Sequence, residues 1–185
     1  MFSLEKELKK YHHLNSIAKN GCTVLFGSDS FAKIPVSELS LGLEMDTPVY
    51  NRSISGLKIE ESEKVLSECI YELNPEKIFI NIGENDIEAA NFESDNFISK
   101  FEWLLYTMHS HCKSRIYVVS LISSNPKSAF INQKLKQVAQ NTGCNFIDIT
   151  AAKNTEQTEL EIFKILRCRL RGRSISMTEA FSIAN

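Results

Sequence analysis

Short apolar runs alternate with longer amphipathic stretches along most of the chain. Five of the runs are rich in β-branched and aromatic residues and predict strands, over residues 22–27, 48–51, 77–82, 115–121 and 145–149. The amphipathic stretches carry apolar residues every three or four positions and predict helices, over residues 3–19, 59–73, 94–111, 127–141, 157–170 and 177–184. Residues 28–46 predict an irregular segment with a short helix around 36–43.

The alternation of strands and helices determines the expected fold class. Strands separated by helices at this spacing form βαβ units, whose strands lie parallel in one sheet. The last three predicted strands are nearly continuous apolar runs, as expected where helices cover both faces of a sheet. We therefore expect a single α/β domain over residues 1–185, a three-layer α/β/α sandwich with a flavodoxin-like, five-stranded parallel sheet. Ligands of such sheets bind beyond the carboxyl ends of the strands.

Composition excludes several classes of protein. The chain has 185 residues, 43% hydrophobic and 24% charged, which is typical of a globular domain. Its net charge of -2 disfavours nucleic-acid binding, and we interpret the arginine-rich stretch at 167–173 as a solvated helix end. The five cysteines are scattered singly, without metal-ligand spacing, so we expect free thiols, a cytoplasmic location and no metal. We expect no membrane span and no cofactor, because no apolar run approaches about 20 residues and no Gly-rich phosphate loop is present.

Polar, turn-forming residues follow three of the predicted strands. The three clusters are GSDSF at 27–31, NRSISG at 51–56 and GENDIEA at 83–89. Each alone is explained as a turn or a helix cap, but three clusters at one sheet edge indicate a site. A serine just past a strand can present its hydroxyl there, while backbone N–H groups and an asparagine amide converge on an oxyanion. The clusters therefore favour acyl-transfer chemistry.

The three clusters resemble the first three sequence blocks of the SGNH, or GDSL-type, esterases. The resemblance covers about residues 20–184 and implies an SGNH fold and a small acyl or carbohydrate ester as substrate. It makes Ser30 the nucleophile, Asp29 a structural aspartate, and Gly56 and Asn85 the oxyanion donors. The family glycine falls on Ser28, one residue after Gly27, and Ser28 is the alternative nucleophile if the register shifts. An oligomer is left open.

The last block of the family, Asp-x-x-His, is where this chain departs from the pattern. The matching positions hold Arg173 and Ser176, and neither side chain is a base at neutral pH. Ser176 instead begins a capping box with Glu179. The resemblance therefore implies either a serine hydrolase of low activity or a degenerate member that binds a ligand or partner protein without turnover. A base supplied by another chain is a third possibility.

Other side chains could in principle replace the missing base. The four histidines are His12, His13, His109 and His111. All four are expected at the amino edge of the sheet, about a strand length or ~17 Å from Ser30, which is beyond the reach of a base. Glu84, Asp86 and Glu88 follow the third strand, but a carboxylate becomes a useful base only if burial raises its pKa. We interpret these three as acids in the first turn of a helix.

Overall fold

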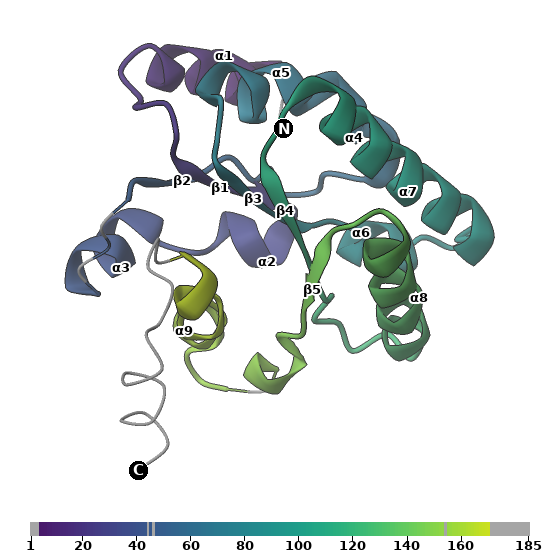
Figure 1. Ribbon diagram of the computed structural model, residues 1–185. Coiled ribbons are helices and arrows are strands. Elements are labelled where there is room, and N and C mark those ends of the chain that lie inside the picture. The colour runs from purple at the N-terminus through teal and green to yellow at the C-terminus, as the bar shows by residue number, and fades with distance from the viewer. Residues whose placement is uncertain (1–3, 44, 46, 154, 171–185) are drawn as a thin grey trace.

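The structure is a computed structural model and describes residues 4–43, 45, 47–153 and 155–170 (Figure 1). Its five strands lie parallel in one sheet, in the order β2-β1-β3-β4-β5. The strands are β1 (Thr23–Gly27), β2 (Val49–Asn51), β3 (Lys77–Asn81), β4 (Arg115–Val119) and β5 (Asn145–Ile147). The predicted α/β sandwich with a five-stranded parallel sheet is therefore confirmed.

Helices cover both faces of this sheet. Those longer than four residues are α1 (Leu4–Asn15), α3 (Val36–Gly42), α7 (Ser94–His111), α8 (Lys127–Asn141) and α9 (Thr158–Leu170). The shorter helical elements are α2 (Asp29–Ala32), α4 (Ile59–Ser62), η1 (Glu63–Val65), α5 (Leu66–Cys69), η2 (Tyr71–Leu73), α6 (Glu84–Ile87) and η3 (Thr150–Ala152). Figure 1 shows α1, α4, α5 and α7 on one side of the sheet, and α2, α3 and α9 on the other.

Two hydrophobic cores account for this layering. On β3, Ile78 and Ile80 belong to the core under α1, α5, α7 and α8, whereas Phe79 belongs to the core under α9. All three side chains are fully buried, which explains why the sequence of this strand is a continuous apolar run. None of the helices in the described part of the chain combines the length and apolar character needed to cross a bilayer.

The predicted continuous helix over 59–73 was wrong. The segment is divided into α4, η1, α5 and η2; Val65 is distorted but stays in the right-handed helical region with φ of -110°, whereas Ile70 leaves it with φ of -133°. Both side chains are fully buried, so the bends bury apolar residues that a straight helix would distribute around its axis. The first helix also ends at Asn15 rather than residue 19, and the predicted helix over 177–184 lies outside the described residues.

Gly27 at the end of β1 packs against Asn81 at the end of β3, and this contact positions the candidate site. A Cβ atom on Gly27 would stand 2.3 Å from the carbonyl oxygen of Asn81 on the neighbouring strand, so no larger residue fits there. The next residue continues the contact, because the N–H of Ser28 donates to the same carbonyl oxygen at 2.9 Å. As a result α2 and α6, which start immediately after β1 and β3, begin beside each other.

Candidate active site

The candidate site is formed where β1, β2 and β3 end. Asp29 and Ser30 lie in the first turn of α2, and Glu84 and Asn85 in the first turn of α6. Gly56 lies in the loop between β2 and α4 and has φ of +79°, in the left-handed region that favours glycine. All five predicted site residues thus lie at one edge of the sheet: Ser28, Asp29, Ser30, Gly56 and Asn85.

The two predicted oxyanion donors converge on the carboxylate of Asp29. Asn85 Nδ2 donates to Asp29 Oδ2 at 2.6 Å, and the backbone N–H of Gly56 donates to the same oxygen at 3.4 Å. We call these two groups, Asn85 Nδ2 and the Gly56 N–H, the donor pair. The sequence predicted the donor pair at this edge but did not predict that a carboxylate of the same chain would occupy it.

Ser28, the alternative nucleophile, is enclosed. Its exposed fraction is 0%, and its hydroxyl accepts a hydrogen bond from Asn85 Nδ2 at 2.5 Å. The same hydroxyl lies 3.5 Å from Asp29 Oδ2. Ser28 therefore has no exposed surface through which a substrate could be attacked in this conformation.

Ser30 is held by Glu84. The Ser30 hydroxyl donates to Glu84 Oε1, and the Ser30 backbone N–H donates to Glu84 Oε2 at 3.0 Å. Glu84 is only 9% exposed. Burial raises the pKa of this carboxyl above its usual range, hydrogen bonds from Ser30 and Ile122 partly oppose the shift, and the charge of Asp29 adds to it. The site thus contains a serine hydroxyl paired with a buried carboxylate.

The other two carboxylates that follow β3 have separate partners. Asp86 is 8% exposed, and both its oxygens lie 3.2 Å from the backbone nitrogen of Ile59, which joins α6 to the start of α4. Burial raises the pKa of Asp86 to about 6. Glu88 is exposed and accepts a hydrogen bond from the Ser123 hydroxyl at 3.0 Å. Among these three acids, Glu84 is the one that contacts a predicted site residue.

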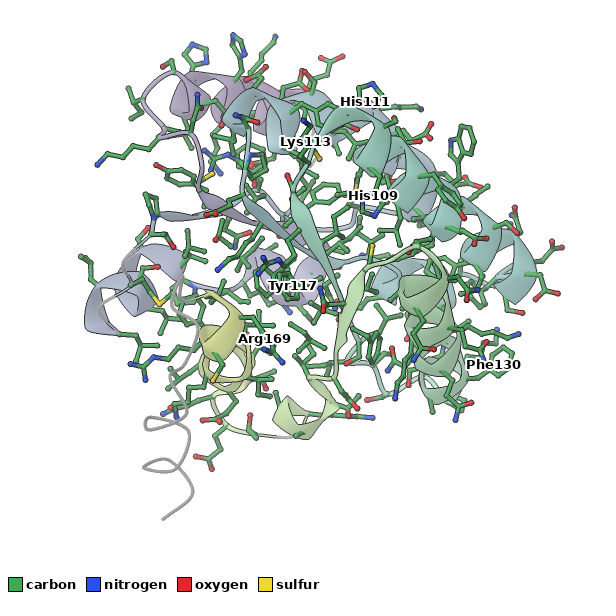
Figure 2. The ribbon with its side chains drawn as sticks, in the orientation of Figure 1. His109, His111, Lys113, Tyr117, Phe130 and Arg169 are labelled. Carbon is green, nitrogen blue, oxygen red and sulfur yellow. The ribbon has the colours of Figure 1, made fainter. Side chains whose placement is uncertain are left out.

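The histidines make contacts on the helices at the other end of the strands. His12 pairs with Glu72 at 3.1 Å, and His13 lies 2.7 Å from the carbonyl oxygen of Lys9. Figure 2 shows His109 and His111, which belong to the last turn of α7. His109 Nε2 lies 3.3 Å from Cys144 Sγ. Their contacts agree with the expectation that none of the four serves Ser30.

The positions of the missing Asp-x-x-His block, Arg173 and Ser176, lie outside the described residues. In the part of the chain that the structure does describe, no group of three His, Cys, Asp or Glu side chains is arranged to hold a metal ion.

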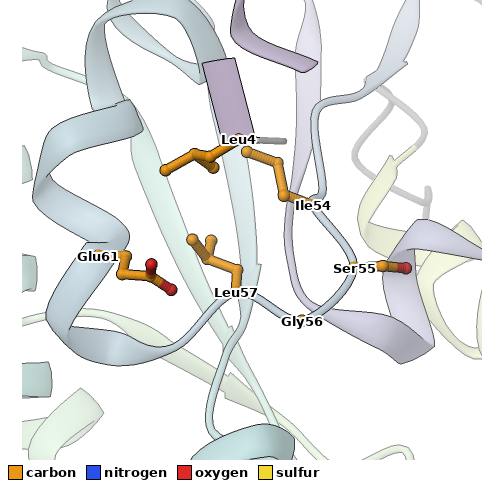
Figure 3. A pocket seen from close by; sticks show the side chains of 6 residues that line it. All are labelled: Leu4, Ile54, Ser55, Gly56, Leu57 and Glu61. Atoms are coloured by element: carbon orange, nitrogen blue, oxygen red, sulfur yellow. The ribbon is translucent and has the colours of Figure 1, made fainter. Parts of the chain in front are cut away.

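A pocket of about 430 Å³ adjoins the donor pair at Gly56 (Figure 3). Leu4, Ile54 and Leu57 provide its apolar surface, and Glu61 lies at its side on α4. Gly56 is the one site residue among those that line this pocket.

Some of these features could not be read from the sequence. The Ser30–Glu84 and Asp29–Asn85 contacts join residues 54 and 56 positions apart, and they depend on how α2 and α6 pack. One signal was available: Gly27, directly after the apolar run, is the residue whose position requires glycine. If Gly27 rather than Ser28 is matched to the glycine of the family's Gly-Asp-Ser, the residue at the serine position is Asp29.

Comparison with known proteins identifies the class of fold. No protein-family model matches the sequence, and no curated protein matches it. Solved structures that it resembles include a GDSL-like lipase from Bacteroides thetaiotaomicron, with a TM-score of 0.71 at 13% identity over 88% of this chain and 96% of that one. Another is Axe2, an acetylxylan esterase from Geobacillus stearothermophilus, with a TM-score of 0.66 at 16% identity over 84% of this chain and 96% of that one.

A further match is a structure described as a candidate platelet activating factor from Streptococcus pneumonia, with a TM-score of 0.76 at 19% identity over 90% of this chain and 92% of that one. These likenesses show that the chain has the fold of the GDSL-like, or SGNH, hydrolases. The resemblance drawn from the three sequence clusters is thereby confirmed at the level of the fold.

Proposed function

We propose that the protein is a slow ester hydrolase of the SGNH type that acts on small acyl or carbohydrate esters, with Ser30 as the nucleophile and Glu84 as the general base. The observation that carries the proposal is the hydrogen bond from the Ser30 hydroxyl to the buried carboxylate of Glu84. The structural neighbours support the reaction class, because they include a GDSL-like lipase and an acetylxylan esterase.

In the proposed reaction, Ser30 Oγ attacks the carbonyl carbon of the ester while its proton moves to Glu84 Oε1. The carbonyl oxygen becomes an oxyanion, which the donor pair stabilises once it is free to do so. Collapse of this intermediate expels the alcohol, which takes the proton from Glu84 and leaves an acyl group on Ser30. Water, deprotonated by Glu84, then attacks the acyl carbon and releases the carboxylic acid and the serine hydroxyl.

Two features of the site explain why turnover should be slow. A carboxylate is a weaker base than imidazole, although burial raises the pKa of Glu84 and so improves the match with neutral pH. In addition, the donor pair is engaged by Asp29 in the resting structure. Hydrolysis should increase with pH as Glu84 loses its proton, because only the ionised carboxylate can accept the proton of Ser30.

The test is hydrolysis of p-nitrophenyl acetate by the purified protein and three variants. Ser30→Ala should reduce the rate to background, and Glu84→Gln should reduce it by about 10²-fold or more and remove the rise with pH. Glu88→Gln is the matched control, because Glu88 also accepts a serine hydrogen bond after β3 but contacts Ser123 instead. It should leave the rate unchanged. Activity that survives both Ser30→Ala and Glu84→Gln would exclude this mechanism.

A second candidate function is binding without turnover, and the occupied donor pair is the observation that favours it. In that case the wild-type protein shows no hydrolysis above background, and mass spectrometry finds no acetyl group on Ser30 after incubation with the ester. An acetylated Ser30 peptide would decide in favour of hydrolysis, since it is the intermediate that the proposed reaction requires.

A further inference from the structure

Asp29 makes contacts that an ordinary turn aspartate does not need. Its Oδ2 atom accepts from the side chain of Asn85 at 2.6 Å and from the backbone of Gly56 at 3.4 Å. The Ser28 hydroxyl also donates to this oxygen, at 3.5 Å. The two members of the donor pair come from the loops after two other strands, 56 and 27 positions away from Asp29 in the sequence. One negatively charged oxygen thus sits where three strands end.

Both donors point at one charged oxygen, as they would at a bound oxyanion, with a short contact from Asn85 and a longer one from Gly56. Hydrogen bonds to a charged acceptor are roughly twice as strong as those to a neutral one, so the neutral carbonyl of an ester is a weaker competitor for the donor pair. The carboxylate is also attached to the chain and is therefore always present at the site. A neutral ligand cannot use the donor pair until Asp29 leaves it.

Removing the Asp29 carboxylate would take the acceptor away from two hydrogen-bond donors. Asn85 would keep the buried Ser28 hydroxyl as an acceptor, but the Gly56 N–H and the second amide proton of Asn85 would lose theirs. Gly56 is exposed and Asn85 is half-buried, so both donors can bind water once the carboxylate is removed. A small anion can replace that water, because hydrogen bonds to a charged acceptor are stronger than those to a neutral one.

We infer that Asp29 is an internal anion that fills the oxyanion hole of this protein, and that the emptied hole is a binding site for small monocarboxylates such as acetate. The binding part of the inference stands on the geometry alone, whereas its consequence for catalysis rests on the proposed function. In the wild-type protein Asp29 then acts as an inhibitor of its own site.

The test is thermal unfolding of the full chain in sodium acetate, with sodium chloride at equal concentration as the ionic-strength control. Asp29→Ala should unfold at a lower temperature than wild type, and acetate should raise its midpoint in a saturable way. Wild type should respond at least tenfold more weakly, because its hole is filled. Asp29→Asn is the intermediate control: its neutral amide oxygen can still accept from the donor pair but more weakly than the carboxylate, so its response should lie between those of wild type and Asp29→Ala.

A second variant assigns the binding to the donor pair. Asn85→Ala combined with Asp29→Ala should lose the acetate response, because only the Gly56 N–H remains. Should Asp29→Ala fail to fold, Asp29→Ser takes its place, since a shorter side chain also vacates the carboxylate position. The inference would be overturned if wild type and Asp29→Ala responded equally to acetate, or if the response survived the loss of Asn85.

Hydrolysis of p-nitrophenyl acetate separates this inference from the proposed function. If both are correct, Asp29→Ala hydrolyses the ester faster than wild type, and acetate inhibits it competitively. If Asp29→Ala binds acetate but hydrolyses the ester no faster than background, Asp29 does fill the oxyanion hole, and the role of Ser30 as nucleophile is wrong. If hydrolysis depends on Ser30 and Glu84 while acetate fails to bind Asp29→Ala, the proposed function stands and the inference that Asp29 fills the oxyanion hole is wrong.

Discussion

Asp86 provides a quantitative test of the electrostatics at the candidate site. The residue directly follows Asn85 and is 8% exposed, and its carboxylate accepts the backbone N–H of Ile59 at the start of α4. Burial raises its pKa from 3.8 to about 6, and the hydrogen bond from Ile59 and the charge of Lys58 oppose only part of that shift. The folded protein therefore holds a proton on Asp86 at pH values where the unfolded chain has released it.

The size and direction of the effect follow from this difference in pKa. A shift from 3.8 to about 6 corresponds to about 3 kcal/mol, because each pKa unit is worth about 1.4 kcal/mol. Between about pH 4 and pH 6 the folded state binds more protons than the unfolded state, so the free energy of unfolding falls as pH rises. The stabilisation is complete below pH 4 and is lost above about pH 6.

The perturbation is Asp86→Asn, which is neutral at every pH and keeps one oxygen as an acceptor for the Ile59 N–H. Chemical denaturation of both proteins from pH 3.5 to 7.5 gives their free energies of unfolding. Comparing the two proteins cancels the contributions of the other carboxylates, including Glu84. The difference should be small near pH 3.5 and should rise to about 3 kcal/mol in favour of Asp86→Asn at pH 7, as an upper estimate.

Glu88→Gln is the control, because it removes an exposed carboxylate two residues further along the chain. A stability difference between Asp86→Asn and wild type that does not change with pH would refute the reasoning. So would a pH-dependent difference of the same size in Glu88→Gln, because it would show that burial is not the cause.

Two further substitutions test the packing that supports the site. Gly83→Ala should lower the free energy of unfolding by about 2–3 kcal/mol, since Gly83 has φ of +133° and the new Cβ would stand 2.7 Å from Phe97 Cζ; an unchanged denaturation midpoint would contradict this. Tyr11→Phe should cost about 1–2 kcal/mol, because the Tyr11 hydroxyl donates to the buried carbonyl of Ser53 at 2.6 Å. If only the dependence of the free energy of unfolding on denaturant concentration changes and the midpoint stays the same, the lost hydrogen bond is not the cause.

The sheet was predictable because its strands are buried on both faces. In β3, the run of Ile78, Phe79 and Ile80 faces the two cores in alternation, so the continuous apolar pattern indicated the strand directly. The helix over 59–73 was not predicted correctly, because apolar periodicity does not show where a backbone bends to bury Val65 and Ile70. Local patterns therefore identified the strands but not the exact path of this segment.

The candidate site was predictable in its location and not in its contacts. Gly56 and Asn85 lie at the carboxyl edge as expected, because each follows a strand within a turn-forming cluster. Glu84 had a sufficient local explanation as an acid in the first turn of a helix. Its burial, and its contact with Ser30, arise only from the packing of α2 against α6. Residue type and spacing contain no information about that packing.

Asp29 and Glu84, the two carboxylates at this edge of the sheet, together restrict the chemistry that the site can support. The proposed hydrolysis would place a developing negative charge at the donor pair, at the position that the Asp29 carboxylate occupies. Like charges close together are unfavourable in a partly buried site, and the charge of Asp29 adds to the upward shift of the Glu84 pKa that burial mainly causes. Transfer of the serine proton neutralises Glu84 during the attack, so Asp29 is the charge that must move. If the proposed mechanism holds, the rate of hydrolysis should depend first on how often Asp29 leaves the donor pair, and only then on the strength of the base.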